Sequence, residues 1–398
     1  MKQATERIRD PWFCLPVLVC MVADAGVSLA CQPAGLDGLR RLGMSAIISP
    51  RQGASLSSKE TAAMGEQDGT SRRRFLGAAL GAGAAGLAAS CAGPKGAVGT
   101  AGPQHGKGQG MKIGFHTDAF NTSYRSFEAC LAWAQKNDVH RIECGVIDGV
   151  SWLHGLGYQP HCALYEDPAL LRKKMLSYGV QFSQIDAAFP MSGPEGATRG
   201  VAYVQKSIAW AKLVGCPHVD TTDGMHAPEG LDDDAAMDLM RFCYEQIIPV
   251  AEAHGIIVNI EPHGYFTTRP EMMEKMLAFV DSPYLRMNMD TGNTFIAGQD
   301  PVAFLKKFIA KVSHVHIKDV SESLAAATRG KQTGIAVSQC AIGDGVNADN
   351  IRTCLAMLRD HGYDGVLSME CEGQGGPMIE KSLAWMRKTC KELNIATT

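Results

Sequence analysis

Short apolar runs and amphipathic stretches alternate along the chain from residue 111 to its C-terminal end. Runs of this length, bounded by turn residues, are typical of buried strands, and the stretches between them have helical spacing. Alternating strands and helices pair the strands in parallel through right-handed crossovers. Eight such units in about 280 residues predict a (β/α)8 barrel. The predicted strands cover residues 112–115, 140–144, 181–186, 218–221, 256–261, 285–290, 312–317 and 366–370.

Helix boundary signals support this prediction. Asp167 and Asp300 each precede a proline, the combination of N-cap residue and first helical position that begins many helices. Gly255 and Gly362 each follow a histidine and precede an apolar run, as expected where a helix ends before a strand. The alternative is a doubly wound open sheet, which is disfavoured because no G-x-G-x-x-G motif follows the first predicted strand.

The last four predicted strands each carry an acidic residue or a histidine close to their end. These residues are Glu261, Asp290, His316 and Glu370. Side chains alternate between two faces along a strand, so a second polar residue shares the face two positions earlier. Those residues are Asn259, Asn288, His314 and Ser368, whereas Ile260, Met289, Val315 and Met369 point to the other face. In a barrel the polar set faces inward at the catalytic mouth.

Three carboxylates and one imidazole form an oxygen-rich set of ligands. Buried charges at this density need a compensating cation. The set suits Mn²⁺, Mg²⁺ or Co²⁺, and Zn²⁺ or Fe²⁺ also accept these ligands. The alternative is that they are ordinary polar strand ends held by hydrogen bonds, but their occurrence on four consecutive strands argues against it. We therefore predict a divalent metal site, with Mn²⁺ as the preferred ion.

The same stretches resemble the sugar phosphate isomerase/epimerase family, the xylose-isomerase-like barrels. The resemblance spans about residues 111–395 and rests on Asn-Ile-Glu261-Pro-His, Asp290-Thr-Gly-Asn293, His314-Val-His316-Ile-Lys318-Asp and Gly-Tyr-Asp-Gly-Val-Leu-Ser-Met-Glu370. It implies that a divalent metal is held by Glu261, Asp290, His316 and Glu370, and that the two glutamates also handle protons. These motifs are specific for the superfamily and are poor guides to the substrate.

This chemistry predicts a proton-transfer enzyme that acts on a ketose or keto-sugar. The metal would stabilise the enediolate that forms when the proton next to the carbonyl leaves. Glu261 and Glu370 would form the acid/base pair, and the site of proton return would distinguish an epimerase from an isomerase. A leaving group β to the carbonyl would instead make the enzyme a lyase, or a hydrolase of 3-keto-glycosides. A sugar-binding envelope protein on a degenerate barrel is disfavoured by the intact ligand set.

Further residues are candidates for substrate contact. His263 would share the inward face if its strand extends that far, and Glu143, at the predicted end of the second strand, is expected to reach sugar hydroxyls. Asn293 stands three residues after the predicted aspartate ligand, where many relatives carry a histidine. That departure leaves the substrate contact at this position open.

Lys318 and Glu372 belong to the same group of candidates. Lys318 could stabilise an oxyanion or hold a substrate hydroxyl, and the alternative is a rim salt bridge with Asp319 or Glu372. Glu372 competes with Glu370 as the metal ligand. Glu370 is preferred because it stands in the Ser-Met-Glu position that the family uses.

The first 110 residues are predicted to lie outside the barrel domain, residues 111–398. Residues 71–76 read Ser-Arg-Arg-Arg-Phe-Leu and precede a run rich in alanine and glycine, which is the pattern of a twin-arginine export signal. The alternative, a basic turn before a buried helix, is weakened by the glycines. Because export signals are N-terminal, we expect translation to start at Met64. Residues 1–63 would then be spurious or disordered, residues 64–91 the signal and residues 92–110 a flexible linker.

Export would make the mature protein periplasmic or attached to a membrane by a lipid. Cys91 is the candidate for lipid attachment, and simple cleavage in the alanine- and glycine-rich region is the alternative. The cysteines of the barrel domain form no C-x-x-C pair, so we expect them to be reduced core residues.

The composition of the chain disfavours nucleic acid as a binding partner. The net charge is −3 and charged residues make up 20% of the chain, without the basic surplus that nucleic-acid binding requires. A DNA-repair endonuclease on the same barrel is therefore disfavoured. We expect a small-molecule carbohydrate as the ligand, and the family resemblance implies a homo-oligomer, either a dimer or a tetramer.

Overall fold

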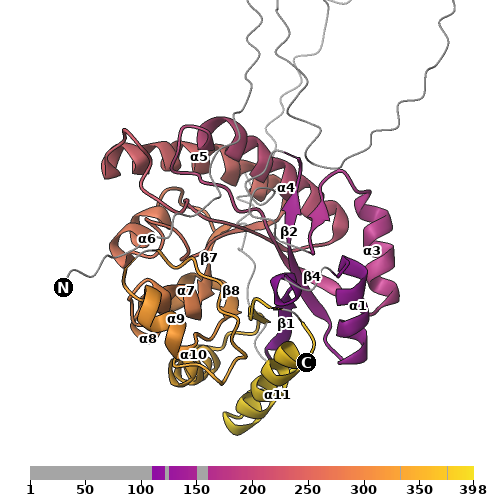
Figure 1. Ribbon diagram of the computed structural model, residues 1–398. Helices are drawn as coiled ribbons and strands as arrows, with labels where there is room; N and C mark the ends of the chain where they lie inside the picture. The colour runs from indigo at the N-terminus through magenta and orange to yellow at the C-terminus, as the bar shows by residue number, and fades with distance from the viewer. Residues whose placement is uncertain (1–109, 122–124, 150–159, 332, 374) are drawn as a thin grey trace, which may run out of the picture. The chain divides into compact units, whose positions relative to one another are not determined.

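The protein is described by a computed structural model that covers residues 110–121, 125–149, 160–331, 333–373 and 375–398. The predicted extension, the export signal with Cys91 and nearly all of the linker lie outside these residues. Parallel strands form a closed barrel that is surrounded by helices (Figure 1). The predicted (β/α)8 fold is confirmed.

Within the described residues, eight strands close the barrel in chain order. They are β1 (Lys112–His116), β2 (Arg141–Ile147), β4 (Gln181–Asp186), β5 (His218–Thr221), β6 (Ile257–Ile260), β7 (Leu285–Asp290), β8 (Val312–Ile317) and β9 (Val366–Met369). The first strand pairs in parallel with both β2 and β9, which closes the sheet. A two-residue strand, β3 (Cys162–Ala163), pairs with the end of β2.

Three strand boundaries differ from the prediction in ways that affect the site. The strands β6 and β9 end one residue earlier than expected, so Glu261 and Glu370 follow their strands directly. The strand β2 continues three residues beyond its predicted end, because Val146 and Ile147 pair with β3. Glu143 therefore lies inside a strand and not at its end.

The helices begin and end at the predicted signals. The side chains of Asp167 and Asp300 accept hydrogen bonds from backbone N–H groups at the starts of α3 and α8. Gly255 and Gly362 end α5 and α10 with φ angles of 66° and 82°, in the left-handed region that glycine adopts without strain. The outer helices are α1 (Phe127–Lys136), α3 (Pro168–Ser177), α4 (Val201–Val214), α5 (Asp233–His254), α6 (Pro270–Met276), α8 (Pro301–Phe308), α10 (Ala348–His361) and α11 (Pro377–Glu392).

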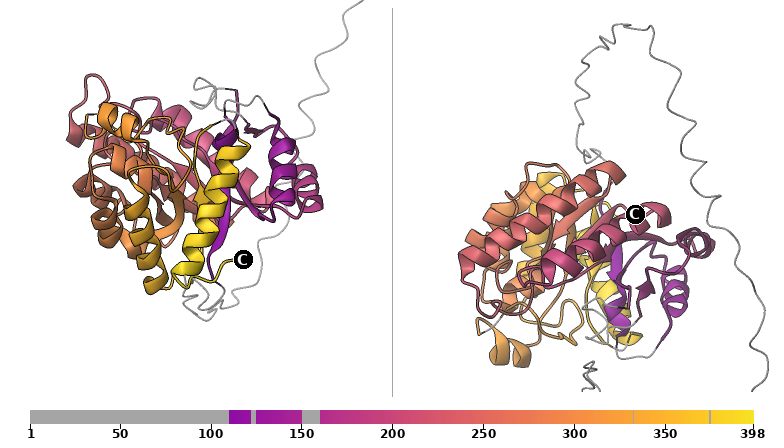
Figure 2. Two further views of the ribbon diagram at one scale, coloured as in Figure 1. Left: turned by 60° about the horizontal axis from the view of Figure 1, so that its bottom comes forward. Right: turned by 90° about the horizontal axis from the view of Figure 1, so that it is seen from above.

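Shorter helices follow individual strands at the end that carries the predicted site. They are the 3₁₀ turn η2 (Thr117–Phe120), the π turn η3 (Gly196–Gly200), α7 (Thr291–Ile296) and α9 (Glu322–Thr328), and a further 3₁₀ turn, η4 (Ile309–Lys311), precedes β8. Figure 2 shows α11 beside β1, as expected where the first and last units of a barrel meet. Arg387 of α11 strengthens this junction by donating a hydrogen bond to the carbonyl oxygen of Asn137.

The two faces of the strands differ as predicted. Ile260, Met289, Val315 and Met369 are fully buried and belong to the apolar layer between strands and helices. The opposite face carries the polar side chains into the barrel. Among the described residues, no helix is long and apolar enough to cross a bilayer. The nine cysteines that the structure describes are free and buried.

Candidate metal centre

Four predicted ligands from four consecutive strands meet at the carboxyl end of the barrel. Glu261, Asp290, His316 and Glu370 are all buried, and one ligand atom from each lies within 4.8 Å of the others. We call these four residues the carboxylate–histidine cluster. They converge because neighbouring parallel strands hold Asp290 and His316 in direct register, with Glu261 and Glu370 at the adjoining strand ends.

The imidazole of His316 stands at the centre of the cluster. Its Nδ1 atom lies 2.9 Å from Oε1 of Glu261 and 3.3 Å from Oε2 of Glu370. Oδ2 of Asp290 lies 3.7 Å from the same nitrogen. Three carboxylates therefore face one ring nitrogen, which is an arrangement that can hold a divalent cation.

Two buried oxygens of the cluster remain available for such an ion. Oδ1 of Asp290 accepts hydrogen bonds from the backbone N–H groups of Gly292 and Asn293, both at 2.6 Å, and thereby caps α7. Its Oδ2 atom, like Oε2 of Glu370, is buried and has no hydrogen-bond donor among the residues that the structure describes. Buried polar atoms are nearly always satisfied, so these two oxygens can serve as ligands of a cation.

The pKa values of the buried carboxylates also favour a cation at the cluster. Burial raises the pKa of Asp290 well above its usual range, and the negative charge of Glu370 raises it further. Burial also opposes ionisation of Glu370, but the charges of Lys318 and His316 outweigh it and hold the pKa of Glu370 well below its usual range. Three ionised carboxylates at this site thus require more positive charge than the side chains supply.

The second ring nitrogen of His316, Nε2, contacts the carboxylate of Glu143. Its Nε2 atom lies 2.8 Å from Oε2 of Glu143, so an Nε2–H group would donate to this carboxylate and leave Nδ1 free for a metal. Burial would raise the pKa of Glu143, but the charges of His316 and His314 hold it well below its usual range.

Glu143 differs here from the sequence prediction. Its side chain is fully buried. It accepts hydrogen bonds from Nε2 of Gln184 at 2.8 Å and from Oγ of Ser368 at 3.1 Å, in addition to the contact with His316. A direct contact with sugar hydroxyls does not fit this position, because the longer strand β2 places the residue beneath the cluster.

A line of hydrogen bonds continues from Glu143 across the barrel. Oγ of Ser313 donates to Oδ1 of Asn259 at 2.5 Å, and Nδ2 of Asn259 donates to Oε1 of Gln184 at 2.6 Å. The amide of Gln184 in turn donates to Glu143. We call Glu143, Gln184, Asn259 and Ser313 the lower polar layer. Its amides each donate and accept, so the layer fixes the carboxylate that orients His316.

Lys318 pairs with Glu372, one of the two partners considered for a salt bridge, but the pair is buried and does not lie at an exposed rim. Its Nζ atom lies 3.0 Å from Oε1 of Glu372 and 3.6 Å from Oε1 of Glu370. Burial would lower the pKa of Lys318, but Glu370 and Glu372 raise it well above its usual range and keep the ammonium charged. Its stem crosses Gly292, where a Cβ atom would come 2.4 Å from Cγ of Lys318. The glycine of the Asp-Thr-Gly-Asn motif makes room for this lysine.

Glu372 is occupied by contacts within the protein. While Oε1 pairs with Lys318, Oε2 accepts a hydrogen bond from the backbone N–H of Ser338 at 2.5 Å. The structure thus brings Glu372 close to the cluster without pointing it at Nδ1 of His316. The choice of Glu370 over Glu372 as the metal ligand stays a prediction.

Asn293 and His263 border the cluster on the side of β6. Nδ2 of Asn293 donates to Oε1 of Glu261 at 3.2 Å. His263 is partly exposed, and its buried Nδ1 atom has no partner in the described part of the chain. Burial lowers the pKa of His263 and outweighs the charge of Glu261, so the ring is neutral. Both side chains can contact a ligand of the cluster.

A buried aspartate, which the sequence analysis did not single out, holds the loop that carries His263. Asp223 accepts hydrogen bonds from Oγ1 of Thr267 at 2.8 Å and from the backbone N–H of Phe266. Oγ1 of Thr267 accepts in turn from the backbone N–H groups of His263 and Gly264. No periodic pattern marks Asp223, since it follows a strand in a loop.

The sequence prediction also missed a pair of buried residues at the end of β1. His116 and Asp118 are buried, with Nδ1 of His116 3.2 Å from Oδ1 of Asp118. Ligand atoms of Asp118, Glu370 and Glu372 also lie within 4.8 Å of one another. The same strand-end rule that located Glu261 would have located His116, because it ends a predicted apolar run.

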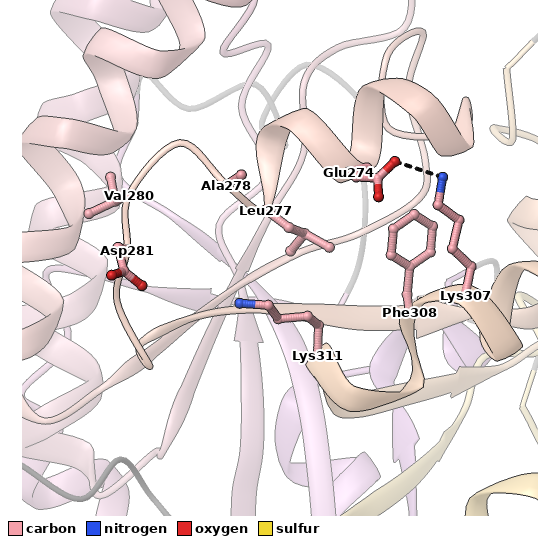
Figure 3. Close-up of a pocket in the computed structure, with 8 residues that line it drawn as sticks. All are labelled: Glu274, Leu277, Ala278, Val280, Asp281, Lys307, Phe308 and Lys311. Atoms are coloured by element: carbon pink, nitrogen blue, oxygen red, sulfur yellow. Dashed lines mark ion pairs between the residues drawn. The ribbon is translucent and has the colours of Figure 1, made fainter.

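A separate pocket of about 500 Å³ opens at the opposite end of the barrel (Figure 3). It lies between α6 and α8, beside Leu277, Phe308 and Lys311. Figure 3 shows Lys307 at its edge, paired with Glu274 at 2.9 Å. Lys311 directly precedes β8, so this pocket faces the amino ends of the strands and is unrelated to the cluster.

Comparison with known proteins adds the family. The model of a family described as xylose isomerase-like TIM barrel matches residues 147–389. This chain belongs to that family. The match includes all four residues of the carboxylate–histidine cluster.

Curated relatives match over part of their length. The inosose dehydratase of Bacillus anthracis is 30% identical over 132 residues, which are 31% of this chain and 43% of the relative. The inosose dehydratase of Clostridium tetani is 29% identical over 107 residues, which are 26% of this chain and 35% of the relative. The chain thus spans less than half the length of these relatives.

Solved structures of the xylose isomerase-like fold superpose over most of the barrel. A D-tagatose 3-epimerase-like protein has a TM-score of 0.57 at 20% identity, covering 71% of this chain and 98% of that protein. An L-ribulose 3-epimerase has a TM-score of 0.57 at 15% identity, covering 71% and 96%. The IolI protein, solved with a zinc atom bound, has a TM-score of 0.54 at 15% identity, covering 71% and 98%. At these identities the likeness establishes the fold.

Proposed function

We propose that the protein is a divalent-metal-dependent enzyme that moves a proton next to the carbonyl group of a keto-sugar. The observation that carries the proposal is the pair of buried oxygens, Oδ2 of Asp290 and Oε2 of Glu370, near Nδ1 of His316. A cation bound there would satisfy both oxygens and balance the charge of the carboxylates.

Glu261, Asp290, His316 and Glu370 would hold the metal. Three oxygen donors and one nitrogen favour Mn²⁺, with Mg²⁺ and Co²⁺ next. Zn²⁺ also deserves a test, since the IolI protein of the same fold was solved with zinc bound. When bound, such an ion supplies Lewis-acid stabilisation of negative charge on a substrate oxygen.

The two glutamates are placed to move the proton. Glu261 and Glu370 follow β6 and β9, three strands apart around the barrel, so they can approach a substrate from different sides. The ammonium of Lys318, 3.6 Å from Oε1 of Glu370, favours the carboxylate form that a general base needs. We assign removal of the proton to Glu370 and its return to Glu261. Asn293 would hold Glu261 in position through its hydrogen bond.

A lyase reaction is the second candidate, and the curated relatives favour it. Two of the relatives are inosose dehydratases, and a dehydratase can remove the same kind of proton and then expel a hydroxyl group. In this chain Glu370 would again remove the proton, while the ammonium of Lys318 would protonate the leaving group. Hydrolysis of a 3-keto-glycoside would need the same first step.

Proton exchange in deuterated water tests the proposal. The full-length chain, stripped of metal and reloaded with Mn²⁺, would be mixed with free ketoses and 3-keto-glycosides, and the signal of the proton next to the carbonyl followed by NMR. We expect exchange with the native protein and at least a hundredfold slower exchange with Glu261→Gln. Glu271→Gln, an exposed glutamate of α6, is the matched control. Exchange that survives Glu261→Gln, or never occurs in the loaded protein, would contradict the proposal.

We further propose that residues 64–91 direct export of the folded enzyme through the twin-arginine pathway, with Cys91 as a candidate for lipid attachment. The support is the Ser-Arg-Arg-Arg-Phe-Leu sequence before an alanine- and glycine-rich run. Replacing Arg72 and Arg73 together by lysine should keep the chain in the cytoplasm of a bacterial host. Export of this variant at the native level would argue against the signal.

A further inference from the structure

A groove of about 470 Å³ lies at the same end of the barrel as the carboxylate–histidine cluster. Its walls come from loops that follow β5, β6, α7 and α9. Active sites of such barrels are built from the loops at this end, and the volume is within the range of sites for small molecules. We call it the rim groove. It is lined in part by Met225, His226, Tyr265, Arg269, Gln299 and Thr333.

The rim groove borders the cluster through two residues. Thr333 lines the groove, and the backbone N–H of the next residue, Gly334, donates to the carbonyl oxygen of His263 at 3.1 Å. A Cβ atom on Gly334 would lie 2.8 Å from Cβ of Asn293, so its backbone rests directly on that residue. Asn293 donates to Glu261 at 3.2 Å. The groove is thus separated from the cluster by Gly334 and Asn293.

Two basic side chains line the groove, and each makes contacts within the protein. Nη1 of Arg269 pairs with Asp233 at 2.9 Å, and its guanidinium group lies 4.4 Å from the ring centroid of Tyr265. Nζ of Lys331, which also lines the groove, donates to the carbonyl oxygens of Ala326 and Ala327 at 3.0 and 2.8 Å. Nη2 of Arg269 is buried and has no hydrogen-bond partner within the described residues, so it can donate to an oxygen of a ligand, including a neutral hydroxyl group.

The groove also has neutral polar side chains. The side chains of His226, Gln299 and Thr333 make no hydrogen bond within the described part of the chain. They are combined with the aromatic ring of Tyr265 and the thioether of Met225. An aromatic ring beside uncharged donors and acceptors suits a hydroxyl-bearing ring, which offers an apolar face and many weak hydrogen bonds.

We propose that the rim groove binds a second, uncharged sugar ring that is joined to the reacting keto-sugar. This inference rests on the proposed function and narrows it, because the natural substrate would be a keto-glycoside or keto-disaccharide rather than a free ketose or a sugar phosphate. In the lyase reaction the second ring would be part of the leaving group.

Substrate preference tests the groove when turnover occurs. The full-length, Mn²⁺-loaded chain would be assayed by deuterium exchange with 3-keto-glucose and with its β-linked glucose disaccharide. We expect the disaccharide to have the higher kcat/KM, and Gln299→Ala to reduce the ratio of the two values by about tenfold, the worth of one or two hydrogen bonds. Gln181→Ala, an exposed glutamine at the opposite end of the barrel, should leave the ratio unchanged. A ratio that Gln299→Ala does not alter would overturn the proposal.

Binding tests the groove even if no substrate is turned over. Cellobiose, glucose and glucose 6-phosphate would be titrated into the full-length chain and followed by saturation-transfer NMR. We expect cellobiose to bind most tightly, with its advantage over glucose lost in both Gln299→Ala and Tyr265→Ala. Equal affinity for cellobiose and glucose, or tighter binding of the phosphate, would refute the second-ring site. Absence of proton exchange together with selective cellobiose binding would refute the enzyme activity and leave the groove in place.

Discussion

The barrel interior contains two polar layers that are both buried but differ in how fully their atoms are paired. In the lower polar layer, Ser313, Asn259, Gln184 and Glu143 form an unbroken line of hydrogen bonds. One level above, Asp290 and Glu370 each keep an oxygen without a donor in the described structure. An unsatisfied buried oxygen costs about 1–3 kcal/mol. The lower polar layer thus serves as scaffold, and we propose that the carboxylate–histidine cluster, the upper layer, is completed by a bound cation.

The largest expected effect concerns the upper layer. Glu370→Gln keeps the shape of the side chain but removes the carboxylate that we propose as general base and metal ligand. We expect kcat for proton exchange to fall on the order of 10²–10⁴-fold, with circular dichroism unchanged. A variant that keeps more than a tenth of the native rate would show that Glu370 does not act as the base.

Removal of the metal is the next test. Binding of an ion to the folded state alone stabilises it by about 2.7 kcal/mol when free metal is a hundred times the dissociation constant. We expect EDTA to lower the thermal midpoint of the native protein and to have little effect on Glu370→Gln. An equal shift in both proteins would place the metal somewhere else.

Glu143→Gln tests the link between the two layers. The substitution replaces a charged acceptor of His316 Nε2 by a neutral amide, so the hydrogen bond that orients the imidazole is weakened. Loss of such a partner typically weakens metal binding about 10–100-fold. Competition with a fluorescent chelator would measure the change. An unaltered affinity would mean that the contact between Glu143 and His316 does not matter for the metal.

The smallest effect is expected deep in the lower layer. Ser313→Ala removes the first donor of the line and leaves Oδ1 of Asn259 short of a partner. We expect a loss of about 1–2 kcal/mol in the free energy of unfolding by urea and an unchanged affinity for the metal. A large drop in metal affinity would show that the layers are not separable in this way.

The barrel and its four-residue cluster could be predicted from the sequence because both follow from periodicity. Strand and helix signals locate eight units, and parity then places Glu261, Asp290, His316 and Glu370 on one face at one end. These inferences need only the alternation of side chains along strands.

Features that depend on tertiary contacts were beyond the same reasoning. Glu143 was assigned to the mouth because β2 was expected to end at residue 144. The strand is longer because it pairs with β3, a two-residue strand that carries no sequence signal. The pairing of Lys318 with Glu372 was only one of two alternatives before the structure showed their proximity. Gln184 and Ser313 are neutral residues in apolar runs, so nothing in the sequence marks the line of hydrogen bonds that they form.

Direct metal binding tests the central claim that the upper layer is completed by a cation. The full-length chain would be stripped of metal and titrated calorimetrically with Mn²⁺, alongside Asp290→Asn and Ser313→Ala. The account predicts one equivalent bound by the native protein and by Ser313→Ala, and none by Asp290→Asn at the same concentrations. Full binding by Asp290→Asn, or no binding by the native protein, would contradict it.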